Sequence, residues 1–348
     1  MSAAPPEVRL RTRVFTIITI LVSLACLGWA LHGVSWSEMG EDIRDLDWRW
    51  MAVAAVFDIL AYVVQGWRWS LLLQPVAAAP VWTSTRSIFV GLFANEVLPL
   101  RAGELIRCFL QARWTDIPFS VTLASALIER IFDGILLIAG LFVSLRYLRH
   151  FPLTFGQNRA VGLVSDGAIA LTILLIVCGA LLAAAMFWRE QTLDMILDAR
   201  MFAWAHVLIE DLHRIGHSRF LYYSFFASIP FFLLQVVPTY AVMQAYGLES
   251  ATWAQAATLT VLLRLTAVVP QAPGNIGLFQ LISTLGLTLF GVPRGMARRF
   301  TLILWGLITL PLLIVGFVVA VASGAKMGEI HREAQAQMRA RQDELAKS

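Results

Sequence analysis

The sequence predicts an all-α integral membrane protein with about six full transmembrane helices and two broken, re-entrant helical segments that form an inverted repeat. The first observation is composition: 58% of the residues are hydrophobic and 14% are charged, whereas soluble domains carry about 25% charged residues. The mean hydropathy is +0.71. The second is the presence of apolar runs long enough to cross about 30 Å of hydrocarbon. The third is a pair of apolar segments interrupted by proline and glycine in one register.

Six apolar runs predict the full spans. Four of them carry no formal charge: residues 14–31, 167–188, 222–246 and 301–325. The other two are residues 51–73, with Asp58 and Arg68, and residues 117–145, with Glu129, Arg130 and Asp133. Carboxylates inside a membrane are costly and usually functional. For Glu129 and Asp133 the alternative is pairing with Arg130 and other arginines for burial alone. For Arg68, snorkelling toward the interface is an alternative to a role in a site.

The orientation follows from the distribution of arginine. Arg9, Arg11 and Arg13 precede the first span, which is longer than a signal-peptide core and is therefore predicted to be a retained helix. The positive-inside rule places the N-terminus in the cytoplasm and the acidic loop at residues 38–47 outside. Residues 1–325 then form the transmembrane domain, and residues 326–348 form a charged cytoplasmic tail. The three cysteines, Cys26, Cys108 and Cys178, lie singly in apolar segments and indicate no disulfide framework.

The two interrupted segments are residues 88–98 with the stretch that follows, and residues 258–269 with the stretch that follows. At an offset of 171 residues, Trp82 aligns with Trp253, Pro99 with Pro270 and Gly103 with Gly274. Proline removes a helix donor, and glycine permits backbone shapes closed to other residues. Each segment is therefore predicted to be a pair of half-helices.

The charge count favours re-entry of both segments. Re-entry leaves residues 189–219, with four arginines, in the cytoplasm, as the positive-inside rule prefers. Six arginines violate this assignment: Arg146, Arg149, Arg159, Arg294, Arg298 and Arg299. Three spans separate the two segments, so they enter from opposite faces. Discontinuous helices in inverted halves point to a transport site near the midplane.

The breaks predict a site for an anion in an intramembrane crevice. A half-helix that starts at a break presents free N–H groups and the positive end of its dipole. The predicted head-group ligands are Asn95, Arg101, Gly103, Glu104, Arg107, Arg130, Arg264, Gly274 and Asn275. The helix breaks are Pro99, Pro270 and Pro273, and the candidate proton carriers are Glu129 and Asp133.

Other interpretations of these residues stay open. Arg101, Glu104 and Arg107 are also compatible with a salt-bridge set that locks the loop, since residues three apart pair along a helix. Glu104 is equally placed to cap its own half-helix. Backbone geometry alone also explains Asn95, Asn275, Gly274 and Gly277.

Four stretches carry a family resemblance. LPLRAGELIR, ALIERIFDGILL and VVPQAPGNIGLFQ, followed by FGVP, resemble the flippase-like membrane domain of lysylphosphatidylglycerol synthases, which also occurs as stand-alone proteins. The resemblance implies a protein of a bacterial-type inner (plasma) membrane that moves a lipid between leaflets. The lipid is expected to be a phospholipid, an aminoacyl-lipid or a polyprenyl-linked lipid. The soluble synthase domain of the fused proteins is not expected after Ala325, so the synthase reaction is not carried over.

The leading functional hypothesis is therefore lipid translocation by a protein that is not an enzyme. We expect no cofactor, no metal and no nucleic acid, and the sequence lacks the GxxxxGK[ST] phosphate loop of ATPases. One alternative is a scaffold or regulator of a lipid or cell-envelope pathway. The other is a lipid-linked glycosyltransferase that uses Asp45 and Asp47 as metal ligands. Whether the chain forms a homo-oligomer stays open.

Overall fold

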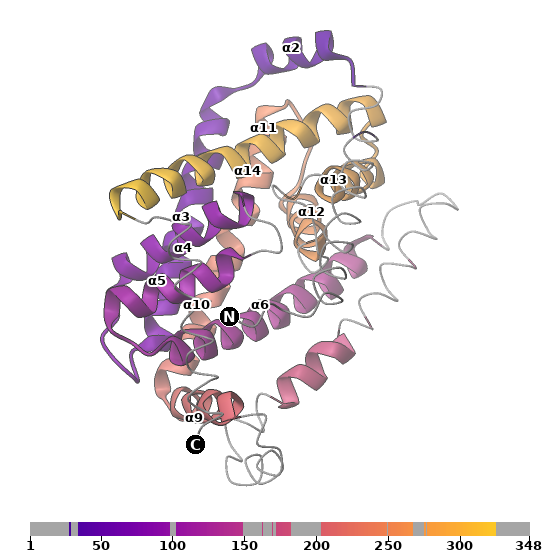
Figure 1. Cartoon of the computed structure of the whole chain (residues 1–348). Helices are drawn as coiled ribbons and strands as arrows, with labels where there is room; N and C mark the ends of the chain where they lie inside the picture. The colour runs from indigo at the N-terminus through magenta and orange to yellow at the C-terminus, as the bar shows by residue number, and fades with distance from the viewer. Residues whose placement is uncertain are drawn as a thin grey trace, which may run out of the picture.

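The computed structural model describes residues 34–97, 102–148, 172–181, 203–248, 250–266 and 277–324, together with residues 28, 162, 169 and 275. Every regular element in these ranges is a helix (Figure 1). The helices are α2 (Trp36–Asp45), α3 (Trp48–Leu73), α4 (Val81–Val97), α5 (Gly103–Thr115), α6 (Phe119–Leu148), α9 (Ala203–Gly216), α10 (Arg219–Leu234), α11 (Val236–Ala245), α12 (Trp253–Thr266), α13 (Leu278–Leu289) and α14 (Arg294–Ala322). The predicted all-α class is confirmed.

Among the described residues, three helical stretches are long and apolar enough to cross a membrane: α3, α10 with α11, and α14. They coincide with the predicted spans at residues 51–73, 222–246 and 301–325. The predicted span at residues 117–145 is the 30-residue helix α6, which is about 45 Å long at ~1.5 Å per residue. Of the predicted span at residues 167–188, the structure describes Ile169 and an apolar helix at Thr172–Leu181. The predicted span at residues 14–31 lies outside the described residues except for Gly28.

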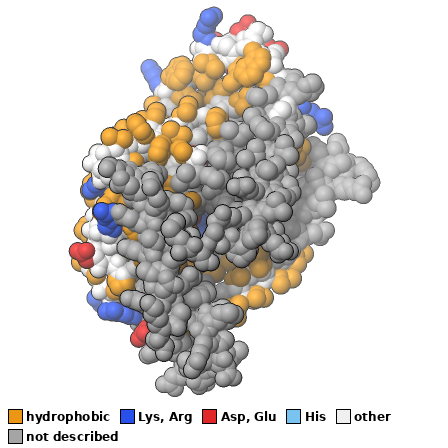
Figure 2. Space-filling model, viewed as in Figure 1, with side chains coloured by type: hydrophobic (Ala, Val, Ile, Leu, Met, Phe, Trp, Pro, Cys, Tyr) orange, Lys and Arg blue, Asp and Glu red, His pale blue; other side chains and the backbone are white. Residues whose placement is uncertain are grey.

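The outer surface of these helices is apolar. Val143, Leu233, Phe226 and Val318 are all more than half exposed, and Figure 2 shows hydrophobic side chains over much of the described part of the visible face. Exposed apolar surface of this extent is typical of contact with lipid. The apolar exterior therefore agrees with a protein that lies in the bilayer.

The first interrupted segment forms a hairpin of α4 and α5, which run antiparallel in close contact. A Cβ atom added to Gly103 would lie 1.9 Å from the carbonyl oxygen of Gly91, so only glycine allows this approach. Farther from the break, the Ser87 hydroxyl donates to Gln111 Oε1 at 2.9 Å, and Gln111 Nε2 donates to Ser84 Oγ at 3.1 Å. Both polar links are buried, and they hold the hairpin together along its length.

The second interrupted segment forms a hairpin of α12 and α13. The two helices meet at Gly286, where an added Cβ would lie 2.9 Å from Leu259 Cδ1. α13 begins after Gly277, whose φ of 102° is accessible to glycine. The Gly277 N–H donates to Gln280 Oε1 at 2.6 Å. The predicted pairing of the two interrupted segments is thus visible as two helical hairpins, on either side of the view in Figure 1.

The two hairpins start at opposite ends of α14. Arg86, near the start of α4, donates to Ser323 at the C-terminal end of α14 at 2.8 Å. Tyr246, shortly before α12, instead contacts Phe300 near the N-terminal end of α14, with ring centroids 5.5 Å apart. The hairpins therefore open toward opposite ends of a helix that is long enough to span the membrane, which agrees with the predicted inverted arrangement.

α2, which precedes α3, contacts the first turns of α14. Arg299 donates to the carboxylates of Glu38 and Asp42, and the Tyr246 hydroxyl also donates to Asp42. Arg299 was one of the arginines that violated the positive-inside assignment, and the acidic residues of α2 compensate its charge. Asp47 accepts a hydrogen bond from the backbone N–H of Arg49 at 2.9 Å and caps α3, which gives this carboxylate a structural role.

Candidate functional cavity

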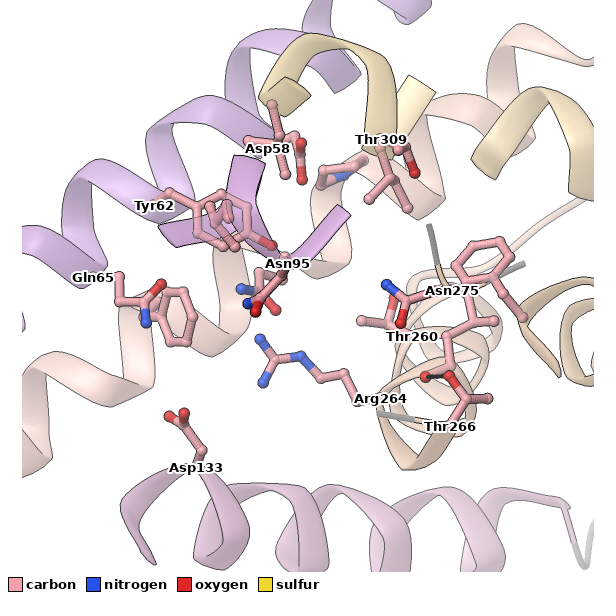
Figure 3. A pocket seen from close by; sticks show the side chains of 18 of the residues that line it. Asp58, Tyr62, Gln65, Asn95, Asp133, Thr260, Arg264, Thr266, Asn275 and Thr309 are labelled. Carbon is pink, nitrogen blue, oxygen red and sulfur yellow. Dashed lines mark hydrogen bonds between the residues drawn. The ribbon is translucent and has the colours of Figure 1, made fainter. Parts of the chain in front are cut away.

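A cavity of about 520 Å³ lies between the two hairpins and the long helices. The long helices contribute Asp58, Tyr62 and Gln65 from α3, Arg130, Asp133 and Leu137 from α6, Phe231 from α10 with Gln235 directly after it, and Trp305, Thr309 and Leu312 from α14. The hairpins add Asn95 and Glu96 from α4, Glu104 from α5 and Arg264 from α12. The lining residues of the long helices lie near the middle of α3, of α6, of the α10–α11 stretch and of α14, so the cavity lies at the mid-depth of these helices. Figure 3 shows the residues that line it from close by.

Three arginines and three carboxylates form a closed ring of ion pairs, which we call the charge ring. Each member pairs with the next one, and the last pairs with the first, in the order Asp133, Arg68, Glu129, Arg107, Glu104 and Arg130. The N–O distances are 2.9 Å for Arg68–Glu129 and for Arg107–Glu129, 3.0 Å for Arg107–Glu104, 3.6 Å for Arg130–Glu104 and 3.7 Å for Arg130–Asp133. The charges cancel within the ring, and its members join α3, α5 and α6.

One side of the charge ring is dry. Arg68 and Glu129 have no exposed surface, and Arg107 is 3% exposed. Arg68 also donates to Ser228 at 3.2 Å, and the Arg107 guanidinium stacks 4.8 Å from the centre of the Trp69 ring. Buried charges persist only when paired and hydrogen-bonded. The snorkelling alternative for Arg68 is therefore wrong, and this side of the ring holds the helices together.

The other side of the charge ring faces the cavity. The side chains of Arg130, Glu104 and Asp133 are 49%, 39% and 17% exposed, and all three line the cavity. Their mutual N–O distances are longer than those on the dry side. Arg130 is thus placed to exchange a loose intramolecular contact for a ligand.

Arg264 is the second arginine on the cavity wall, and it is held differently. Its guanidinium lies 5.2 Å from the centre of the Phe231 ring and 4.9 Å from that of Phe232. It forms no ion pair with any carboxylate in the part of the chain that the structure describes. Figure 3 shows the side chain pointing from α12 into the cavity. Aromatic faces orient a guanidinium without neutralising it, so its charge remains available to an anion.

The comparison with known families covers most of the chain. A family model described as the lysylphosphatidylglycerol synthase transmembrane region matches residues 16–316. The chain belongs to this family. The lysylphosphatidylglycerol synthase membrane region thus includes both hairpins, the cavity and all six members of the charge ring.

One curated relative matches a smaller part of this family member. The glycosyltransferase AglD of Haloferax volcanii is 29% identical over 134 residues, which is 38% of this chain and 21% of AglD. The chain therefore aligns with about one fifth of that protein's length. No solved structure matches the chain.

The structure of this lysylphosphatidylglycerol synthase family member brings six of the predicted ligands and carriers together. The residues on the cavity wall are Asn95, Glu104, Arg130, Asp133, Arg264 and Asn275. Gly103 lies instead in the α4–α5 contact, and Arg107 and Glu129 form the dry side of the charge ring. The salt-bridge alternative for Glu104 and Arg107 matches their 3.0 Å pair. Pro99, Arg101, Pro270, Pro273 and Gly274 lie outside the described residues.

Sequence reasoning missed part of the α3 face of the cavity. Asp58, Tyr62 and Gln65 all line it, and only Asp58 was singled out from the sequence, without a role. The spacing of four and three residues places the three side chains on one face of a helix. A polar stripe inside an otherwise apolar span was the available signal.

Proposed function

We propose that the cavity binds the anionic head group of a membrane lipid and that the protein moves this lipid between the two leaflets. The proposal is based on Arg264, a cation at mid-depth that forms no ion pair with a described carboxylate. The charge ring is neutral in itself, so Arg264 is a cation on the cavity wall whose guanidinium can pair with an anion from outside the ring. The family membership supports a role at the membrane in lipid biology.

An arginine without an ion-pair partner at this depth is expensive, which argues for a ligand. Placing arginine at the centre of a spanning helix costs about 2.5–3.5 kcal/mol on insertion scales. A phosphate would recover such a cost, because the planar guanidinium matches two phosphate oxygens and charge-assisted hydrogen bonds are strong. Arg130, half exposed across the cavity, supplies a second cation for the same head group.

The size of the cavity supports a head group and not a whole lipid. Small-molecule sites are commonly about 300–1,000 Å³, and the volume of about 520 Å³ falls in this range. Acyl or polyprenyl tails would stay in the bilayer beside the apolar outer faces of the helices. The proposal assigns no chemical reaction to the chain.

The test is leaflet exchange in proteoliposomes. The purified protein is reconstituted with a panel of labelled lipids: an anionic phospholipid, an aminoacyl-lipid and a polyprenyl phosphate. Arg264→Gln should slow exchange of the transported lipid about 10- to 100-fold, because a hydrogen bond to a charged group contributes about 1.5–3 kcal/mol. Arg294→Gln makes the same chemical change at an exposed position outside the cavity and should exchange lipid at the wild-type rate.

Two results would overturn the proposal. Wild-type exchange by a folded Arg264→Gln protein would remove the anion-binding role of this arginine. Failure of the wild-type protein with every lipid of the panel would favour a scaffold that acts in a lipid pathway without moving lipid itself.

A further inference from the structure

Asp58 is a buried carboxyl group on the cavity wall that the charge ring does not include. It is 4% exposed and lies in the middle of α3. Among the described residues, its Oδ2 atom has no hydrogen-bond partner, and the group forms no ion pair. Figure 3 shows Asp58 above Tyr62 on α3, at the edge of the cavity. Glu129 and Asp133, by contrast, each bind arginine.

The charged and titratable groups around the cavity come from several helices. They are Tyr62 on α3, Glu96 on α4, Glu104 on α5, Arg130 and Asp133 on α6, and Arg264 on α12. From α10, α11 and α14 the described lining residues are uncharged, and they include Phe231, Thr239 and Thr309. Glu104, Arg130 and Asp133 belong to the charge ring. Asp58 and Arg264 thus form no ion pair among the described residues, and Glu96 is a further carboxyl on the cavity wall outside the charge ring.

We propose that Asp58 binds a proton when the anionic head group binds, so that lipid and proton move together. The inference rests on the proposed function, because it requires an anion at Arg264. The coupling requires Asp58 to be ionised in the empty cavity, whose wall also carries Arg264. With a phosphate on Arg264, ionised Asp58 would be an uncompensated negative charge in the same cavity as the bound anion, in a space of low dielectric. A proton from water then forms an O–H bond on the carboxylate, and it leaves when the lipid leaves.

The coupling is reciprocal. If the anion raises the proton affinity of Asp58, the proton raises the affinity of the cavity for the anion by the same factor. A protonated carboxyl also gains an O–H donor, and a phosphate oxygen can accept a hydrogen bond from it. An ionised Asp58 would instead repel the phosphate.

Glu129 and Asp133, the carriers expected from the sequence, are less suited to this task. Glu129 accepts from Arg68 at 2.9 Å and from Arg107 at 2.9 Å, and Asp133 accepts from Arg68. A proton on either carboxylate would leave a buried arginine without a counter-charge. Asp58 holds no arginine, so its protonation breaks no ion pair among the described residues.

The experiment measures proton uptake on lipid binding to the purified full chain in detergent. The probe is dihexanoyl phosphatidylglycerol, whose phosphodiester stays ionised across the measured pH range, and dihexanoylglycerol is the uncharged control lipid. In weak buffer with a pH indicator, the wild-type protein should take up protons with the phospholipid and not with dihexanoylglycerol. Its affinity for the phospholipid should fall by up to about tenfold per unit rise in pH, the limit for one coupled proton.

Asp58→Asn should bind the phospholipid with an affinity independent of pH and without proton uptake. The amide resembles the protonated carboxyl in shape, so the protein should fold. Asp58→Glu keeps a titratable group and should keep proton uptake. The matched control is Asp116→Asn, an exposed carboxyl at φ 54°, a backbone conformation that asparagine tolerates. It should behave as the wild type.

The outcomes separate the two proposals. Phospholipid binding by the wild type without proton uptake overturns the role of Asp58 and leaves the proposed function standing. Proton uptake that persists in Asp58→Asn also overturns it, because another group then carries the proton. Absence of phospholipid binding in the wild type, combined with failure of the lipid panel in proteoliposomes, rejects the proposed function and this inference with it.

Discussion

Replacing Glu129 with glutamine should strongly destabilise the protein, because this carboxylate is shared by two buried arginines. Glu129 has no exposed surface. Its Oε1 accepts from Arg68 Nη2 and its Oε2 accepts from Arg107 Nη1, both at 2.9 Å. Glutamine removes the charge and turns an NH2 donor toward one of the two guanidinium donors. Each arginine keeps one carboxylate partner, Asp133 for Arg68 and Glu104 for Arg107.

The magnitude follows from the cost of leaving a buried charge uncompensated. Removal of one partner from a buried ion pair costs about 3–5 kcal/mol. Each 1.36 kcal/mol is a factor of ten, so the ratio of folded to unfolded protein should fall by more than about 100-fold. The total stability of a domain is about 5–15 kcal/mol. A loss of this size should deplete the folded protein in the membrane.

The assay is denaturation by sodium dodecyl sulfate in mixed micelles, followed by circular dichroism, with the yield of monodisperse protein as a second measure. Glu41→Gln is the matched control, since Glu41 is exposed and surface changes usually stay within about 0.5 kcal/mol. The double variant Arg107→Gln with Glu129→Gln should recover part of the loss, with a coupling energy of about 0.5–3 kcal/mol. If Glu129→Gln is as stable as Glu41→Gln, the charge ring does not hold α3, α5 and α6 together.

Two other predictions concern the hairpins. Gly103→Ala should destabilise the protein by about 1–3 kcal/mol, because the added methyl would lie 1.9 Å from the Gly91 carbonyl oxygen. Gly306→Ala, whose added methyl would lie 3.9 Å from Leu310 Cδ1, should be neutral or slightly stabilising in the same denaturation assay. In a background without native cysteines, Arg113→Cys after α5 should react with a membrane-impermeant thiol reagent from the cytoplasm, and Arg294→Cys at the start of α14 from outside. Labelling of both positions from one face would contradict the inverted arrangement of the hairpins.

The helices and the interrupted segments were predictable because their signals are local. Apolar runs of sufficient length mark the spans, and Gly103 of the first predicted break is the first residue of α5. The close contact at Gly91 and Gly103 explains why two glycines are needed in the first hairpin. Local chemistry alone accounts for these features.

The pairing of the charges was not predictable, because it depends on which helices pack together. Arg68 and Glu129 are 61 residues apart in the sequence, and no local sequence pattern indicates that their two helices pack together. The same packing buries Arg107 away from the cavity and leaves Arg264 on its wall. Before the packing is known, Arg107 and Arg264 have the same local features, since each lies beside a break in an apolar segment. Both were therefore predicted to be head-group ligands.

Entry of a lipid head group into the cavity at mid-depth can be tested by cross-linking a labelled lipid to α14. Thr309 lines the cavity, whereas its neighbour Leu310 is 53% exposed on the outer surface. The two positions lie at the same depth, so they serve as a matched pair. Each is replaced by cysteine in a background without Cys26, Cys108 and Cys178, and the protein is reconstituted with a phospholipid that carries a maleimide on its head group.

Thr309→Cys should react with the maleimide lipid and Leu310→Cys should not, because a polar head group reaches mid-depth only through the cavity. Adding Arg264→Gln should lower the labelling of Thr309→Cys about 10-fold or more, by loss of the charged contact to the phosphate. Equal labelling of the two cysteines would contradict the entry of the head group into the cavity. Labelling of Thr309→Cys that Arg264→Gln leaves unchanged would contradict the binding of the head group by Arg264.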